Sequence, residues 1–189
     1  MVVADGLVLI CGGSRSGKSR WAEHLAASSG RPVLYLATAA ERPNDAAWCA
    51  RLERHRQRRP EQWGCLEVGS RLAEAVATLQ QADHPQAEHL LLIDSLGTWL
   101  AQHLEADAPR WQALQQELVA VVAAHRAPVL LVCEEVGLGV VPATAIGNLF
   151  RDRLGELSQR LMAVSGESWL VVAGRALPLH HLGQAVPER

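Results

Sequence analysis

Eight consecutive residues near the start of the chain combine glycines with hydroxyl and basic side chains. They are Gly12, Gly13, Ser14, Arg15, Ser16, Gly17, Lys18 and Ser19, and they fit the P-loop pattern G-x-x-x-x-G-K-[ST]. The glycines let backbone N–H groups curl around a β-phosphate, Lys18 reaches the β- and γ-phosphates, and the Ser19 hydroxyl can bind Mg²⁺. The pattern therefore predicts a site for a nucleoside triphosphate.

The flanking sequence favours this interpretation over a glycine-rich turn that matches by chance. An apolar run over residues 7–11 precedes the motif and a helical pattern over 20–25 follows it, which is the context that a P-loop needs. Lys18 is also the only lysine among 18 lysine and arginine residues. A chain this biased toward arginine keeps a lysine where a compact ammonium is needed rather than a planar fork.

A second candidate for chemistry is Asp94, which directly follows four large aliphatic residues at 90–93. This pattern is typical of a central parallel strand that delivers a carboxylate to the carboxyl edge of a sheet, where ligands of such folds bind. We predict that Asp94 and Ser19 hold Mg²⁺. The alternative is a strand that simply ends in aspartate at a turn.

Strand and helix patterns alternate along the chain and must position these residues. Strands are predicted over 7–11, 33–37, 65–68, 90–94, 128–133 and 168–173. Helices are predicted after the P-loop and over 46–58, 70–81 with Ser70 as N-cap, 96–104, 110–125 and about 143–164. The glycine-rich segment 136–142 is predicted to be a loop on the active-site side. This alternation predicts an α/β fold with a mostly parallel sheet covered on both faces, closed by the sixth strand.

Length and composition favour a single domain over residues 1–189, because 49% of the residues are hydrophobic and 20% are charged. A net charge of −2 gives no overall attraction to nucleic acid or to an anionic membrane. The four cysteines are widely spaced without a C-x-x-C pair, which predicts buried thiols rather than disulfides or a zinc site. No secretory segment follows Met1 and no apolar stretch is long enough for a membrane span, so we expect a cytoplasmic protein.

A basic segment over 51–60 places five arginines around His55. These are Arg51, Arg54, Arg56, Arg58 and Arg59. The segment is interpretable as a solvated helix surface, as a contact for nucleic-acid phosphates, or as a set of cations that hold the phosphates of a mobile nucleotide beside a nucleophile. The low pI of about 6.4 and the 4% aromatic content weaken the second interpretation. The residues alone do not favour either the first or the third interpretation over the other.

In order along the chain, the motifs resemble those of the bifunctional adenosylcobinamide kinase / adenosylcobinamide-phosphate guanylyltransferase family of cobalamin biosynthesis. The resemblance runs from residue 7 to about 174 and is carried by residues 12–19, 35–39, 51–60 with Trp63, 91–94, 135–142 and 150–152. Many families share the P-loop. The pattern R-x-x-x-H-R-x-x-R-P followed by E-V-G-x-G-x-V-P is far more specific.

The resemblance implies a three-layer P-loop NTPase fold similar to the recombinase core, a homotrimer and two reactions. A nucleoside triphosphate, ATP or GTP, phosphorylates the aminopropanol hydroxyl of adenosylcobinamide, and GTP then guanylylates that phosphate through a histidine-GMP intermediate. By position, His55 matches the guanylylated histidine. Nucleotide contacts are implied for residues 12–19 and for Ala37, Thr38, Ala39, Arg56, Gln57, Arg58, Arg59, Glu67 and Asp94.

Three departures from the family pattern involve four positions. Ala47 and Trp48 stand where an acidic residue and methionine are frequent, and Glu134 and Ser158 each stand where asparagine is common. These departures bear on the corrinoid pocket and the kinase step rather than on the nucleotide chemistry. Two other functions compete with the family assignment: a recombinase-type ATPase that grips nucleic acid through residues 51–59, and a P-loop kinase for another small alcohol.

Overall fold

A computed structural model describes residues 5–39, 45–81 and 83–187, and its seven strands form one sheet in the order β3-β2-β4-β5-β1-β6-β7. Every neighbouring pair is parallel except β6 and β7. The strands are β1 (Leu7–Gly12), β2 (Val33–Ala37), β3 (Gly64–Glu67), β4 (Leu90–Asp94), β5 (Val129–Glu134), β6 (Glu167–Val172) and β7 (Arg175–Pro178). The carboxyl ends of the six parallel strands therefore meet at one edge of the sheet.

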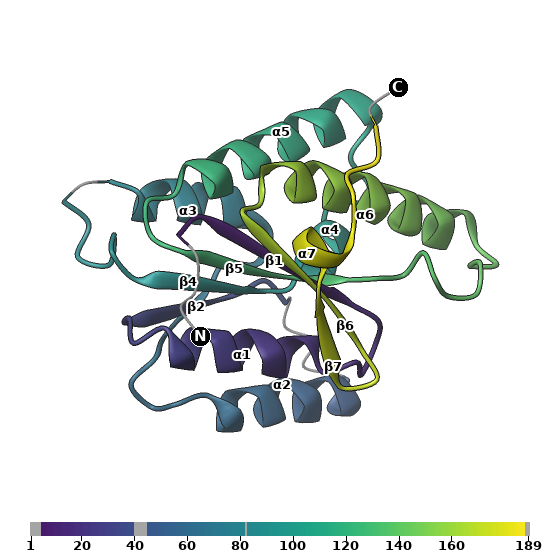
Figure 1. Ribbon diagram of the computed structural model, residues 1–189. Helices are drawn as coiled ribbons and strands as arrows, with labels where there is room; N and C mark the ends of the chain where they lie inside the picture. The colour runs from purple at the N-terminus through teal and green to yellow at the C-terminus, as the bar shows by residue number, and fades with distance from the viewer. Residues whose placement is uncertain (1–4, 40–44, 82, 188–189) are drawn as a thin grey trace.

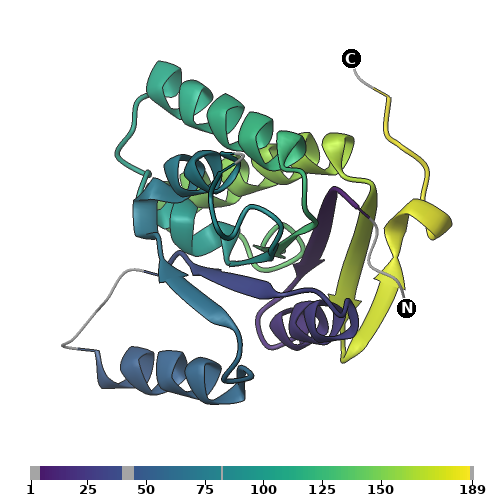
Figure 2. The same cartoon turned by 90° about the vertical axis from the view of Figure 1, so that its left-hand side faces the viewer.

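Helices cover both faces of this sheet, as the alternating patterns predict. In Figures 1 and 2, α1 and α2 lie on one side and α3, α4, α5 and α6 lie on the other. The described helices are α1 (Lys18–Ser28), α2 (Ala46–Arg58), α3 (Leu72–Leu79), α4 (Leu96–Ala101), α5 (Ala108–Ala124), α6 (Ala145–Val164) and the short C-terminal α7 (Leu179–Leu182), with a 3-10 turn, η1 (Gly69–Arg71).

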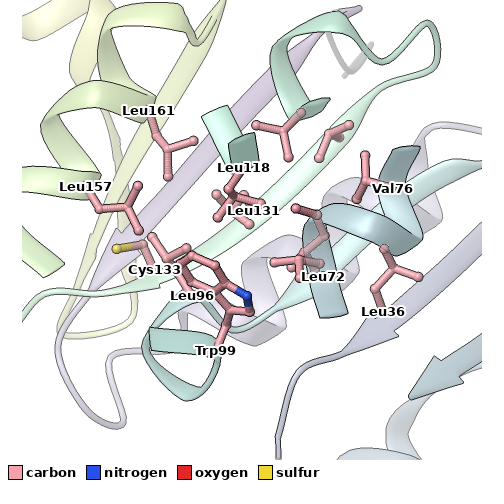
Figure 3. Packing of buried hydrophobic residues seen from close by; sticks show 14 of the residues in the cluster. Leu36, Leu72, Val76, Leu96, Trp99, Leu118, Leu131, Cys133, Leu157 and Leu161 are labelled. Carbon is pink, nitrogen blue, oxygen red and sulfur yellow. The ribbon is translucent and has the colours of Figure 1, made fainter. Parts of the chain in front are cut away.

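The larger core lies between the sheet and helices α3 to α6 (Figure 3). Alternate residues of β5 contribute to opposite faces: Leu131 and Cys133 pack in this core, whereas Leu130 and Val132 pack on the side of α1. Both faces are buried, which explains why the central strands are nearly continuous aliphatic runs. Trp99 of α4 is 1% exposed, and its indole N–H donates to the Ser70 carbonyl at 3.1 Å.

The sequence prediction is wrong at the end of the sheet, because β7 pairs antiparallel with β6 and adds a seventh strand. The connection consists of Ala173 and Gly174, whose φ angles of 48° and 74° are both positive, as tight two-residue hairpin turns require. Alanine is unusual at the first of these positions. The turn is therefore not evident in the sequence.

Other predicted boundaries also differ from the structure. Ser70 does not cap a helix but lies within η1, because Gly69 turns the chain with a φ of 52° and α3 begins only at Leu72. None of the four cysteines forms a disulfide, yet only two of them are buried, since Cys49 and Cys65 are exposed. The bounds of α2 and β2 agree with the prediction.

A buried arginine joins α6 to the connection between α4 and α5. Arg153 is 8% exposed, and its guanidinium donates to the carbonyl oxygens of His103 at 3.0 Å, Leu104 at 3.2 Å and Ala106 at 2.6 Å. The guanidinium also lies over the Trp111 ring, 5.0 Å from its centroid. One side chain thus donates to three carbonyls of this connection, of which that of His103 also accepts from the Ala106 amide at 3.1 Å.

Replacing Arg153 by Met should keep the aliphatic packing but remove the guanidinium that donates to the carbonyls of Leu104 and Ala106 and the second donor to that of His103. We expect a loss of about 3 kcal/mol in the free energy of unfolding, which corresponds to a fall in Tm of about 6–12 °C for a chain of this size. Arg160→Met on the same helix is the control, because Arg160 pairs only with Glu156 at the surface. Equal melting temperatures for the two variants, measured by calorimetry, would contradict the role given to Arg153.

Candidate active site

The predicted P-loop forms a tight turn between β1 and α1 at the carboxyl edge of the sheet (Figure 1). Arg15 and Gly17 have positive φ angles of 58° and 105°, and the Ser16 amide donates to the Gly13 carbonyl at 3.2 Å. A side chain at Gly12 has no room, because its Cβ would lie 2.5 Å from the Val171 carbonyl oxygen. This loop can therefore wrap closely around a phosphate group.

Lys18, the first residue of α1, is 6% exposed, and its ammonium turns back over the loop. Its Nζ donates to the Gly13 carbonyl oxygen at 3.4 Å, which is a long contact for a buried cation. Burying an ammonium is costly unless acceptors surround it. Phosphate oxygens bound in the loop would supply those acceptors, so the geometry suits a polyphosphate.

Asp94 ends β4, and its position is fixed by a neighbouring strand. The Tyr35 hydroxyl donates to Asp94 Oδ2 at 3.0 Å, while the Arg59 guanidinium lies 4.0 Å from the centroid of the Tyr35 ring. Burial, and next the negative charge of Asp94, raises the pKa of Tyr35 well above its ordinary value, so the hydroxyl remains a donor. Tyr35 is the only tyrosine in the chain and was not predicted as a site residue.

The donors present fit a magnesium ion that is completed by its substrate. Mg²⁺ is commonly held by one or two protein oxygen ligands together with phosphate oxygens and water. Ser19 lies on the first turn of α1, directly after the loop, and Asp94 lies at the same edge of the sheet. Within residues 5–39, 45–81 and 83–187 no group of three or more His, Cys, Asp or Glu side chains could hold a metal by itself.

Of the predicted nucleotide contacts, residues 37–39 follow β2 at the same edge. Thr38 is fully buried, and its hydroxyl donates to the Ser95 carbonyl oxygen at 2.6 Å and accepts from the Ser95 amide at 2.8 Å. The Thr38 carbonyl accepts from the Gln102 side chain at 2.7 Å. The Thr38 side chain therefore secures the turn after β4, which is a structural task that its sequence position does not indicate.

Helix α2 carries the basic segment and is joined to the rest of the fold through its arginines. Arg56 pairs with Glu67 at the end of β3 at 2.7 Å, and Arg58 pairs with Glu23 of α1 at 3.1 Å. Hydrogen bonding to Glu67 raises the pKa of Arg56. Burial raises the pKa of Glu23, and Arg58 opposes that rise. The described side chains of α2 are exposed, and Figure 2 shows the helix standing below the sheet beside α1.

Arg59, just after α2, reaches furthest into the fold. Besides its contact with Tyr35, its guanidinium donates to the Cys65 sulfur at 2.9 Å. Gln57 instead donates to Glu53 on its own helix at 2.9 Å. His55 lies in the last turns of α2 between Glu53 and Arg56; its side chain, like those of Arg51 and Arg54, is outside the described part of the structure.

The predicted loop after β5 lies on the active-site side. The Glu135 amide donates to the Gly12 carbonyl at 2.9 Å, and the Glu135 carboxylate accepts from the amides of Gly137 at 2.6 Å and Leu138 at 3.3 Å. Three apolar side chains of the loop project into solvent: Leu138 is 85% exposed, Val140 95% and Val141 64%. The loop is thus fixed to the P-loop strand at its start and presents an apolar surface beyond it.

A P-loop at the carboxyl edge of a parallel sheet, with a carboxylate at the end of a nearby strand, defines a nucleotide-binding protein of the P-loop NTPase class. Residues 8–179 match the family model described as "Cobinamide kinase / cobinamide phosphate guanyltransferase". The chain belongs to this family of bifunctional enzymes.

Curated relatives agree with this assignment over nearly the whole chain. The chain is 38% identical over 182 residues to the "Bifunctional adenosylcobalamin biosynthesis protein CobU" of Escherichia coli (strain K12), covering 89% of this chain and 96% of that protein. It is 39% identical over 172 residues to the "Bifunctional adenosylcobalamin biosynthesis protein CobP" of Pseudomonas aeruginosa, covering 90% of this chain and 95% of the relative.

Solved structures support the fold alone. The Pyrococcus horikoshii OT3 protein PH0250 superposes with a TM-score of 0.56 at 7% identity, over 95% of this chain and 87% of its own. The KaiC-like protein PH0186 of the same organism gives a TM-score of 0.50 at 15% identity, over 87% of this chain and 70% of its own. In the part of the chain that the structure describes, no helix is both long and apolar enough to cross a membrane.

Substituting Lys18 tests the nucleotide site directly. Lys18→Ala should abolish tight triphosphate binding and lower the kinase kcat by about 100- to 1000-fold, because the developing phosphate charge loses its ammonium. Lys18→Arg should also fail, since a planar fork does not fit a loop shaped around a compact cation. Arg20→Ala, which removes an exposed cation two residues further along α1, is the control. Wild-type affinity in either Lys18 variant, measured by calorimetric titration, would remove the loop from the mechanism.

Proposed function

We propose that this chain catalyses two successive transfers on adenosylcobinamide within one transferase domain. ATP or GTP first phosphorylates the aminopropanol hydroxyl, and GTP then donates GMP to the new phosphate, giving adenosyl-GDP-cobinamide. Family membership supports both reactions. The structural observation that carries the proposal is the attachment of the arginine-rich helix to the P-loop edge of the sheet, through Arg56 to Glu67 and Arg59 to Tyr35.

In the kinase step, the substrate hydroxyl oxygen attacks the γ-phosphorus. A new P–O bond forms, the bond to the β-phosphate oxygen breaks, and the hydroxyl proton is released. Such transfers need positioning and charge stabilisation more than covalent chemistry. Residues 12–17 offer backbone amides to the phosphates, and Lys18 places an ammonium beside them. Residues 37–39 lie at the carboxyl end of β2, on the same edge of the sheet and next to the end of β4, and would line the nucleotide site.

Mg²⁺ is the ion that this site would use, with the Ser19 hydroxyl and the Asp94 carboxylate as its protein ligands. When bound, the ion would neutralise phosphate charge and fix the geometry of the transferring group. The hydrogen bond from Tyr35 would hold the Asp94 carboxylate in place at this edge of the sheet.

In the second step, we propose that an imidazole nitrogen of His55 attacks the α-phosphorus of GTP. An N–P bond forms and pyrophosphate leaves; a phosphate oxygen of cobinamide phosphate then attacks the same phosphorus and the N–P bond breaks. Arg56, Arg58 and Arg59 would contact the phosphates, exchanging or sharing their present partners. Two guanidinium–carboxylate pairs already show the charge-assisted hydrogen bonding that phosphate would use.

The competing function, a recombinase-type ATPase that binds nucleic acid through residues 51–59, is less favoured. Arg56 and Arg58 are paired with carboxylates, and the chain has a net charge of −2. Binding to phosphate backbones through this segment would fall steeply with salt. Filter binding of single-stranded DNA at two salt concentrations distinguishes the two functions, and we expect no salt-dependent retention.

We also propose a cytoplasmic homotrimer. The support is the apolar surface formed by Leu138, Val140, Val141 and the nearby Ile146, which are between 57% and 95% exposed. Contiguous apolar side chains of this size commonly mark an interaction site. Sedimentation equilibrium would measure the assembly.

Replacing His55 by Ala should separate the two reactions. Phosphoryl transfer needs no protein nucleophile, so the kinase activity should persist, whereas guanylyl transfer should be lost. Wild-type protein incubated with GTP and Mg²⁺ should gain one GMP in intact mass spectrometry, through an acid-labile bond. Adduct formation should slow below about pH 6.5, because a protonated imidazole cannot attack phosphorus.

His181→Ala, on the exposed C-terminal helix, is the control and should form the adduct normally. An acid-labile GMP adduct on the His55→Ala protein would show that another histidine is the nucleophile. Loss of both activities from a folded His55→Ala protein would show that the two reactions share one site more fully than proposed.

A further inference from the structure

Glu134, the last residue of β5, is joined by both carboxylate oxygens to the turn that follows β4. Its Oε1 accepts from the Ser95 hydroxyl at 2.6 Å, and its Oε2 accepts from the Gly97 amide at 2.8 Å. Asp94 pairs in register with Val132, so Glu134 lies two residues beyond that pair and reaches over the turn. Hydrogen bonds to an ionised carboxylate are shorter and stronger than neutral ones.

Gly97 is fitted to this carboxylate. A Cβ at Gly97 would overlap Glu134 Oε2 and would lie 2.9 Å from Glu134 Cδ. Real Cβ atoms do not approach other atoms so closely, so the carboxylate would have to move if any side chain were present. The absence of a side chain at Gly97 therefore leaves the room that the Glu134 carboxylate occupies.

The segment held by Glu134 directly follows Asp94 and is also bonded to Thr38. Asp94, the proposed ligand of Mg²⁺, immediately precedes Ser95, and the Ser95 amide and carbonyl are both bonded to the Thr38 hydroxyl. On its other side, Glu134 is in register with Gly12, the first residue of the loop. Glu134 thus connects β5, the strand beside β1, to the residues that directly follow Asp94.

We infer that Glu134 is a positioning residue, which fixes the turn at residues 95–97 so that Asp94 is directed toward the metal and the bound phosphates. The inference rests on the proposed kinase step and adds to it a residue that departs from the family pattern. Both carboxylate oxygens are already bonded to the turn, so Glu134 acts through its neighbours rather than on the substrate.

Four variants test the inference: Glu134→Ala, Glu134→Gln, Gly97→Ala and the double variant Gly97→Ala with Glu134→Ala. Partners that orient a metal ligand typically contribute 10- to 100-fold to metal affinity. Glu134→Ala should therefore raise the Mg²⁺ concentration for half-maximal kinase activity by about 10-fold. The Asp94→Asn variant gives the Mg²⁺ titration expected when the proposed metal ligand itself is lost. Glu156→Ala, a surface carboxylate on α6, is the control and should leave the titration unchanged.

Glu134→Gln should recover most of the wild-type Mg²⁺ response, because an amide can accept from Gly97 and donate to Ser95 in the same geometry. Gly97→Ala should reproduce the Glu134→Ala defect by displacing the carboxylate. In the double variant, Gly97→Ala should add little to the defect caused by Glu134→Ala, because the carboxylate that the new methyl group would displace is already absent. Melting temperatures are measured in parallel for all variants.

A lower Tm for Glu134→Ala with an unchanged Mg²⁺ titration would overturn the inference, because a merely structural role predicts that result. A Glu134→Gln protein as impaired as Glu134→Ala would also overturn it, since charge rather than turn geometry would then matter. If the wild type lacks cobinamide kinase activity, the proposed function fails separately. Mg²⁺-dependent binding of a fluorescent GTP analogue to the same variants then tests the positioning role of Glu134 without the kinase reaction.

Discussion

The register of the parallel strands is the constraint on which the candidate site depends. Gly12 lies opposite Glu134, Ala37 lies opposite both Asp94 and Glu67, and all of these residues end their strands. A shift of one residue in any pair would exchange the two faces of that strand and move its last side chain off the edge. In β1, β2, β4 and β5 nearly every side chain is buried, so a shift would disrupt close packing on both faces of the sheet. Apolar packing of the strands thus determines where the polar residues of the candidate site lie.

Two kinds of attachment hold the helices to this sheet. Helices α3 to α6 bury leucine, valine and tryptophan side chains, and Arg153 adds a buried network between them. Helix α2 is held by guanidinium contacts at the surface, and exposed ion pairs contribute only about 0–1 kcal/mol each. Among the described contacts, those that secure the helix bearing His55 are made by guanidinium groups that would also contact phosphate. The same arginines would thus both attach α2 to the fold and bind phosphate.

The sequence was sufficient to predict the six parallel strands, the P-loop and the bounds of α2, because each depends on local patterns: apolar runs, glycine spacing and the stop at Pro60. It could not reveal partners that the fold brings together from distant segments. Tyr35 and Asp94 are 59 residues apart, and Glu134 and Gly97 are 37 apart. Strand β7 was missed for a local reason, since Ala173 adopts a left-handed conformation that alanine rarely takes.

The two outermost strands have a further consequence. Both β3 and β7 are four residues long, and β7 ends at Pro178, which has no N–H to donate. Short edges that end in proline or carry charge offer little backbone for another molecule to extend the sheet, which protects against amyloid-like stacking. Any contact between copies of this chain would then rely on side chains rather than on a continuous intermolecular sheet.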